Sequence, residues 1–419
     1  MSQWLEQVID NAKDVSDFLT PTRQASLAEL KAQGWPGKRT ENWRFTPLTS
    51  VSQRDAVKVA NAGEAEVPVI ENLDVFDIVF VDGQLITSIA DIDLPEGLTL
   101  STLDDVSGDD EQAVKALFGH IKPQRHTFGL INDALATQGV FIDVAANANI
   151  QPTIRICNLT TQAVDVHSRV LVRIGEGASV TVMEHGEGNA DSLTTAFAEY
   201  SIADNGYLEH YRFALFTDKA KQVGGSHFRL GDHARLNSTV VGYGSELSRL
   251  DVDIIHAGEF ADAKMNAIYL LAENELFDLH TNIEHAVPNC TSEENARGII
   301  GDGARAVFNG RIHIHRDAQK TLAEMNNKNL LLSRRALINT KPELEIYADD
   351  VKCAHGATVA EIDDTALYYL LSRGISRSKA LVILNFGFIQ ELVNEIPKAA
   401  IGTWLLPKLS TRFSQMEVK

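Results

Sequence analysis

The chain has 419 residues, of which 44% are hydrophobic and 23% charged, the balance of a globular protein with enough apolar residues for a sizeable core. Its 57 acidic residues outnumber its 38 basic residues. The formal net charge of −19 argues against binding to nucleic acid, whose phosphates it would repel. No apolar run approaches the roughly 18 residues that a membrane helix needs, so no membrane association is expected.

The cysteines and the N-terminal sequence indicate in which cellular compartment the protein is expected. Cys157, Cys290 and Cys353 are odd in number and far apart, which does not fit a disulfide framework. The sequence MSQWLEQVIDNAKDV has early acids and no apolar run, unlike a secretory signal. We therefore expect a cytoplasmic protein with free thiols.

Residues 1–120 form a first region of mixed, largely helical character. The apolar residues of WLEQVI fall on one face of an expected helix, and a second helix around 25–32 is expected to end at QGWPG. The stretch FDIVFVDGQL predicts two short strands around an Asp82–Gly83 turn. The acids that open DDEQAVKALFGHI suit the positive N-terminal end of another helix.

Residues 121–362 are expected to form many short β-strands, such as TIRICNL, SVTVMEH and RIHIH. Small-residue turns precede several strands: GEGAS, DNGYL, GDHAR, GEFAD and GDGAR. Positions 178, 207, 234 and 261 in the first four turns are 29, 27 and 27 residues apart, and position 304 in the fifth follows after 43. Such a period predicts a stacked β-solenoid. A β-sandwich, which also has regularly spaced short strands, is the alternative.

Residues 363–419 return to helical patterns. DDTALYYLLSRG predicts one helix, SRSKALVILNFGFIQELVNEI a second with Ser376 as its N-cap, and a third is expected near 398–413. The second carries an apolar stripe at helical spacing, made of Leu381, Leu384, Phe388 and Leu392. We expect this region either to cap the end of the solenoid or to offer the stripe to a partner.

Most standard catalytic motifs are absent from the sequence. It has no G-x-x-x-x-G-K-[ST], no G-x-S-x-G, no H-E-x-x-H and no C-x-x-C. Two groups of histidines leave a metal site open. His313 and His315 alternate in RIHIH and so face one side of a strand, either as a solvent-facing pair or as metal ligands. His280, Glu284 and His285 form a looser set.

Cys353 and His355 in YADDVKCAHGATV are the strongest site candidates. In an extended strand they project the same way, about 6.6–7 Å apart, which is too far for the direct hydrogen bond of a nucleophile and its base. They can instead supply two ligands to iron, copper or zinc, with the remaining ligands from another chain. The alternative is an edge thiol and an exposed histidine without a role.

Three stretches together resemble the SufB/SufD family of iron–sulfur cluster assembly proteins. LEIYADDVKCAHGATVAEID (344–363), followed by YYLLSRGIS (368–376), resembles the family signature. GKRTENWRFTPL (37–48) resembles its N-terminal motif, and LLSRRALINTKPELEI (331–346) resembles the core strand before the signature. Within the family the chain is most like SufD, since it has no obvious counterpart of the additional cysteines and the Glu-His-Glu run of SufB-type chains.

The resemblance implies a right-handed parallel β-helix core with helical N- and C-terminal regions. It also implies a non-catalytic scaffold subunit of the SUF complex that pairs with SufB and binds the SufC ATPase, to which the ATPase activity belongs. His355 and Cys353 match the functional histidine and nearby cysteine at the SufB–SufD interface, where clusters are assembled and iron is acquired. The C-terminal stripe would face SufC or the end of the β-helix.

The resemblance further implies no stably bound cofactor, only a transient iron–sulfur cluster or iron at the interface, with docking of a flavin reductant and a homodimer of the isolated chain left open. Two other functions remain as alternatives. A carbohydrate-active β-helix enzyme would need paired carboxylates and usually aromatic residues along a groove, but aromatic residues are only 7% of the chain. A structural, self-associating solenoid is the second alternative.

Overall fold

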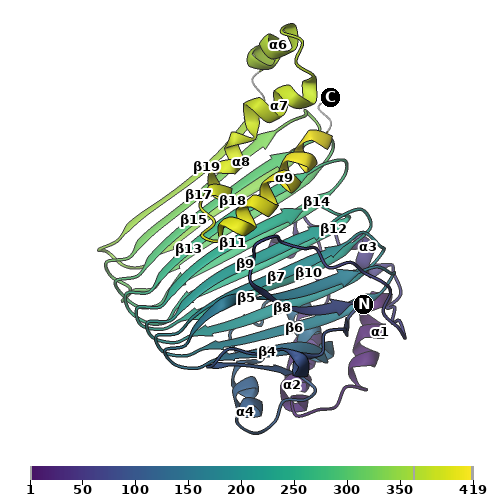
Figure 1. Ribbon diagram of the computed structural model, residues 1–419, viewed down its shortest axis with the longest axis vertical. Helices are drawn as coiled ribbons and strands as arrows, with labels where there is room; N and C mark the ends of the chain where they lie inside the picture. The colour runs from purple at the N-terminus through teal and green to yellow at the C-terminus, as the bar shows by residue number, and fades with distance from the viewer. Residues whose placement is uncertain (1, 362–363, 417–419) are drawn as a thin grey trace.

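The computed structural model describes residues 2–361 and 364–416 and consists of a long solenoid of strands with helices near both chain ends (Figure 1). The strands form two sheets, sheet A with 10 strands and sheet B with 9. Apart from the antiparallel pairs β1–β2 and β3–β4, neighbouring strands run parallel. The parallel β-solenoid expected from the sequence is confirmed, and the β-sandwich alternative is wrong.

From β4 onward, successive strands alternate between the two sheets, which winds the chain into a solenoid. Sheet A holds, in spatial order, β2 (Gln84–Leu85), β1 (Val75–Val81), β5 (Asn149–Thr160), β7 (Ser179–Gly188), β9 (Tyr207–Phe216), β11 (Arg235–Tyr243), β13 (Asp262–Leu271), β15 (Thr291–Ile300), β17 (Leu322–Leu331) and β19 (Lys352–Glu361). Sheet B holds β3 (Leu98–Thr102), β4 (Gln138–Val144), β6 (Asp165–Ile174), β8 (Leu193–Ile202), β10 (Lys221–Leu230), β12 (Leu247–His256), β14 (Leu276–His285), β16 (Arg305–Ile314) and β18 (Leu337–Ile346).

The register of sheet A explains the sequence period. Ser179, Tyr207, Arg235 and Asp262 are aligned in four consecutive turns, with steps of 28, 28 and 27 residues. The first four turn sequences precede strands of sheet A, whereas GDGAR precedes β16 of sheet B. Its longer spacing therefore reflects one and a half turns of the same solenoid.

The corners of the solenoid are stacked as regularly as its strands. Asn205 and His233 have left-handed backbone angles, with φ of 59° and 55°, a conformation that most side chains disfavour. The Asn205 N–H donates to the carbonyl of Asp232 at 2.8 Å, and the His233 N–H donates to that of Glu259 at the same distance. Backbone groups at these corners are thus paired between successive turns, although Asn205 and His233 themselves are exposed.

The helices lie at the two ends of the chain and between the first strands. They are α1 (Gln3–Ala12), α2 (Thr20–Gln33), α3 (Thr49–Ser52), α4 (Gly108–Leu117), α5 (Thr127–Leu135), α6 (Asp364–Ser372), α7 (Arg377–Asn385), α8 (Gly387–Asn394) and α9 (Ala399–Gln415), with short 3-10 turns η1 (Glu41–Trp43) and η2 (Ile89–Asp91). The Asp82–Gly83 turn and the helices expected near 25–32, at the DDEQ stretch and near 398–413 are present.

Two elements differ from the sequence prediction. Helix α5 lies where only strands were expected. All of its residues are buried, because its apolar side chains pack on the solenoid and its Asn132 and Asp133 are paired with the buried Arg169. The single helix expected from Ser376 is interrupted at Phe386, which keeps helical angles of φ −65° and ψ −32° between α7 and α8. In addition, β1–β3 join the sheets, so the first 120 residues are continuous with the solenoid.

The helices cover the outer faces of the two sheets. Leu392 of α8 and Leu405 of α9 pack with Val241 and Ile268 of sheet A. Trp4 and Phe128, from α1 and α5, pack with Phe197 and other outer-face residues of sheet B. Figure 1 shows α9 lying in front of the strands of sheet A and running in roughly their direction, with α6 and α7 projecting past the last turn. The C-terminal helices thus cover a side of the solenoid and do not close its end, contrary to the end-cap expectation.

No helix within residues 2–361 and 364–416 combines the length and apolar character needed to cross a membrane.

The inside of the solenoid, which we call the lumen, is packed with side chains in columns that follow the register. One column runs from His210 through Ser238, Met265, Glu294 and Met325 to His355. Glu294 is fully buried, and in the described part of the chain neither of its carboxylate oxygens has a hydrogen-bond partner. Burial raises the pKa of Glu294 to about 7.

This buried carboxyl group predicts a pH-dependent stability. The neutral form stabilises the fold at low pH, and that contribution is lost as pH rises from the ordinary pKa of 4.5 to about 7, because the folded state then has to ionise Glu294 in the lumen. Glu294→Gln removes the charge, so we expect it to raise the free energy of unfolding at pH 8 by about 3 kcal/mol, and by less at pH 5.

Urea denaturation midpoints of both proteins at pH 5 and pH 8 measure this difference. Glu293→Gln is the matched control, because the half-buried Glu293 lies next in sequence but on the outer face of β15. A Glu294→Gln protein that gains no more at pH 8 than at pH 5 would contradict the prediction.

Candidate functional site

The last turn of the solenoid holds the two residues singled out from the sequence. Cys353 and His355 lie on β19, in register with Ala323 and Met325 of β17, which are both buried in the lumen. Side chains in register on parallel strands share a face, so Cys353 and His355 also face the lumen. Within the described residues no strand lies beyond β19, and His355 is therefore exposed and Cys353 half-buried.

The Cys353 thiol is only partly buried. It packs against the lumen cluster, and this burial raises the pKa of the thiol above its ordinary value. At neutral pH the group is therefore a thiol, and a metal ion has to displace its proton in order to bind. Together with the imidazole of His355, the turn offers two ligands with no third one beside them in the described part of this chain.

The open turn also exposes apolar side chains. Strand β18 is the edge of sheet B as β19 is of sheet A, so both present unpaired backbone groups. Leu337 and Ile346 at the two ends of β18, Tyr347 directly after it and Val359 on β19 are exposed. Exposed apolar residues gathered at a sheet edge are typical of an interaction surface.

The predicted C-terminal stripe is mostly turned toward the protein itself. Leu381 and Leu392 are buried in the cluster on the outer face of sheet A, and Leu384 and Phe388 are half-buried against it. Partner binding by these four residues stays a prediction. The buried Leu381 and Leu392 can contribute to it only indirectly, by positioning α7 and α8. The exposed apolar side chains of this region are others, namely Tyr368, Tyr369 and Ile383.

The remaining histidines of the sequence analysis do not form one site. His313 contacts Glu345 at 2.9 Å and His315 contacts Glu284 at 2.6 Å, both on the outer face of sheet B. His285 points into the lumen, where its ring stacks on that of His256 at a centroid distance of 4.2 Å. Since Glu284 and His285 lie on opposite faces of β14, the loose set with His280 is split between the two faces.

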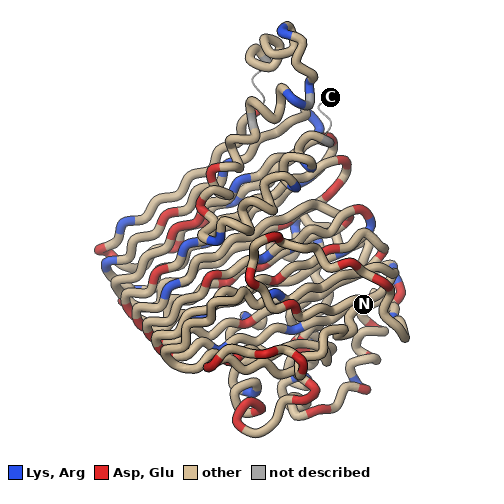
Figure 2. Tube along the Cα trace, in the orientation of Figure 1, with Lys and Arg blue, Asp and Glu red and all other residues tan. Residues whose placement is uncertain are grey.

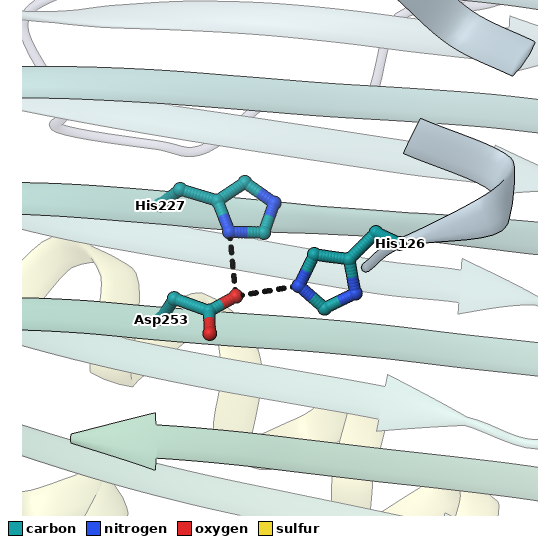
Figure 3. A group of neighbouring side chains, drawn as sticks. All are labelled: His126, His227 and Asp253. Carbon is teal, nitrogen blue, oxygen red and sulfur yellow. Dashed lines mark hydrogen bonds and ion pairs between the residues drawn. The ribbon is translucent and has the colours of Figure 1, made fainter. Parts of the chain in front are cut away.

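A third group of side chains was missed at the sequence level. His126, His227 and Asp253 meet on the outer face of sheet B (Figure 3), with ligand atoms within 4.8 Å of one another. No local spacing joins residues so far apart in the chain. Their contact depends on the β10–β12 register, which pairs His227 with Asp253, and on the start of α5, which brings His126 over them.

Comparison with known proteins gives consistent matches along the chain. A family model described as "SUF system FeS cluster assembly, SufBD core domain" matches residues 157–388, and "SufBD protein N-terminal region" matches residues 4–156. "Iron-sulfur cluster assembly protein SufD" of Escherichia coli is 29% identical over 94% of this chain and 93% of its own length.

Two further relatives are similar over most of the chain. An "Iron-sulfur cluster assembly SufBD family protein" of Synechocystis is 27% identical over 94% of this chain and 91% of its own length. "Protein ABCI7, chloroplastic" of Arabidopsis thaliana is 24% identical over 96% and 87%.

The burial of the three free cysteines predicts a selective reaction. Cys157 and Cys290 are fully buried, so in the folded chain at low concentration only Cys353 should react with iodoacetamide. The reaction should be slower than that of a free cysteine and should accelerate with pH, because burial raises the Cys353 pKa.

Mass mapping of alkylated peptides measures the labelling, with Cys353→Ser as the control that should remain unlabelled. Labelling of Cys157 or Cys290 as fast as that of Cys353 would show that this account of the open turn is wrong.

Proposed function

Because the chain belongs to the SufBD family of iron–sulfur cluster assembly proteins, we propose that it is the SufD-type scaffold subunit of a cluster assembly complex. The observation that carries the proposal is the open last turn, in which Cys353 and His355 face an uncovered lumen. In this proposal a SufB-type chain covers that turn and supplies the missing ligands.

The edge of the last turn supports pairing with a similar solenoid. Strands β18 and β19 have free backbone groups, and the exposed Leu337, Ile346 and Val359 would lose apolar surface to a partner. A second solenoid with an open end of the same kind can satisfy both needs by continuing the sheets. The same surface would let the isolated chain pair with itself as a homodimer.

The iron–sulfur cluster, or iron alone, is the cargo of this site and not a resident cofactor. Iron–sulfur clusters are held by thiolates, with imidazole as an alternative ligand, so the side chains of Cys353 and His355 fit in kind but not in number. A cluster held by two chains can be released when their interface opens. Burial keeps Cys353 protonated until a metal arrives, which suits transient binding.

The SufC ATPase is proposed to bind the projecting helices α6 and α7. Tyr368, Tyr369 and Ile383 are exposed there, and tyrosine is common among the residues that dominate interfaces. Figure 2 shows basic residues in this part of an otherwise acidic chain, among them the exposed Arg373, Arg377 and Lys379. In this proposal ATP hydrolysis belongs to SufC, since the sequence lacks a P-loop, and the present chain is a non-catalytic scaffold.

We place the chain in the cytoplasm, where a reducing environment suits three free cysteines. The family match gives no reason to prefer a carbohydrate-active enzyme or a purely structural self-associating solenoid.

Removing the imidazole of His355 should separate assembly of the complex from loading of the cluster. In a complex co-purified with its SufB- and SufC-type partners, we expect His355→Ala to leave the subunit ratio unchanged. Because one ligand of the interface site is lost, iron and acid-labile sulfide per complex should fall by about tenfold. His120→Ala, a change at an exposed histidine near the N-terminal helices, is the control. Unchanged iron and sulfide in the His355→Ala complex would refute the assigned role.

Removing apolar surface from α6 and α7 should weaken binding of the ATPase alone. Tyr368 is 74% exposed, so Tyr368→Ser combined with Ile383→Ser is not expected to disturb folding. We expect the affinity for SufC in a pull-down titration to fall by about tenfold or more, with pairing to SufB retained. Val69→Ser is the matched control, because Val69 is 75% exposed but lies in the N-terminal region. Wild-type affinity of the double variant would exclude this surface.

A further inference from the structure

The group formed by His126, His227 and Asp253 lies on the side of the solenoid, away from its open end. His227 is on β10 and Asp253 on β12, two adjacent strands of sheet B, and His126 directly precedes α5 (Figure 3). His227 and Asp253 are almost fully buried, and His126 is 9% exposed. The group is therefore a buried site, and only His126 lies at its edge.

One carboxylate oxygen joins the two imidazoles. Asp253 Oδ2 lies 2.8 Å from His126 Nε2 and 2.8 Å from His227 Nδ1. In a tetrahedral zinc site with bonds of about 2.0–2.2 Å, neighbouring ligand atoms are about 3.3 Å apart. Separating each contact by about half an ångström would therefore make room for a metal ion bound by these three atoms.

The surroundings orient the ligands as they do in established metal sites. His126 Nδ1 faces Asp251 Oδ1 at 3.6 Å, so it can carry the imidazole proton when Nε2 binds a metal. Asp251 is itself held by Arg249 through bonds of 3.0 and 2.8 Å. The ring of His227 stacks on Phe197 at a centroid distance of 5.9 Å and an angle of 6° between planes.

The motif at residues 37–48 completes this support. The Arg249 guanidinium lies 4.1 Å from the Trp43 ring centroid and donates to the carbonyl of Asn42 at 2.5 Å. The motif thus holds Arg249, which holds Asp251, which faces His126. Through these contacts the N-terminal motif helps to position His126 in the group with His227 and Asp253.

A cleft of about 300 Å³ connects the group to solvent. Its lining includes His126 and Asp253 of the group and also Glu41, Arg311 and Glu345. Arg125 forms an ion pair with Asp253 Oδ1 from the rim, where its side chain is 44% exposed. The cleft therefore provides an entry path for a hydrated ion.

We propose that His126, His227 and Asp253 bind one divalent transition-metal ion of the Zn²⁺ or Fe²⁺ class, at a site separate from Cys353 and His355. Two imidazoles and one carboxylate are a common ligand set for these ions, and they leave a coordination position open toward the cleft. Metal binding through His126 Nε2 and His227 Nδ1 leaves the other nitrogen of each ring, His126 Nδ1 and His227 Nε2, to carry a proton. Asp253 Oδ1 stays within reach of Arg125.

The charge and hydrogen bonds of the three side chains are also compatible with a purely structural role, which is the alternative to metal binding. Burial alone would raise the pKa of Asp253, but His126, His227 and Arg125 outweigh it and hold that pKa well below its usual range. Burial also lowers the pKa of His227, which keeps its ring neutral and able to act as a ligand. A purely structural His–Asp–His contact would have the same features but would not take up a metal.

Titration of the full chain with Co²⁺ distinguishes the two accounts. We use Cys353→Ser/His355→Ala protein, stripped with a chelator, so that the open turn contributes no ligand. We expect one equivalent of Co²⁺ to bind with visible d–d absorption and to be displaced by Zn²⁺. His126→Gln should weaken the affinity by about tenfold or more, and Asp253→Asn should do the same.

His313→Gln/His315→Gln is the matched control, because it removes a neighbouring surface pair whose rings lie 4.7 Å apart. This control should bind Co²⁺ with unchanged affinity. Far-UV circular dichroism of each variant verifies the fold, and His126 is the preferred change because it lies at the rim. Absence of saturable Co²⁺ binding, equal affinity in His126→Gln, or loss of binding only in the surface variant would overturn the proposal. None of these outcomes depends on the role of His355.

Discussion

Backbone hydrogen bonding between successive turns is the interaction on which this molecule depends. Each strand of the solenoid pairs with the strand one turn before it and the strand one turn after it, and the corners are joined in the same way. The last turn has a neighbour on one side only. Its unpaired edges and uncovered lumen residues are therefore a direct result of how the fold is built.

The alternation of side chains along each strand divides the chemistry of the protein between two surfaces. Lumen-facing positions are apolar over most of the length and gain polar groups at intervals, ending in Cys353 and His355. Outer-face positions bind the helices or carry charged groups. Arg169, fully buried, bonds both Asp133 of α5 and Glu199 of β8, and Glu199 accepts backbone N–H groups from Ile121 and Lys122. This network fixes the segment that delivers His126 to sheet B.

Much of the fold follows from local patterns, because a solenoid repeats its rules. The turn spacing predicted the period, and the alternation in the signature placed Cys353 and His355 on one face of a strand. Local patterns failed where packing decided the outcome. Every residue of α5 is buried, polar ones included, so the helix has no solvent-exposed face, and the break at Phe386 divides a stripe that the sequence shows as continuous. His126, His227 and Asp253 could not be predicted, because their contact requires the strand register and the docking of α5 at once.

The stacking of whole turns also sets the distance between the side of the solenoid and its end. His227 lies on β10, and the next strand in the chain, β11, is separated from β19 by four strand spacings in sheet A. At about 4.8 Å per spacing, His227 and His355 are about 20 Å apart along the solenoid axis. At that separation the free-energy effects of substitutions at the two places should add, since no side chain is shared between them. The solenoid thus holds the group on its side and the residues of its open end at a fixed separation, and either place can be altered, by mutation or by evolution, without changing the other.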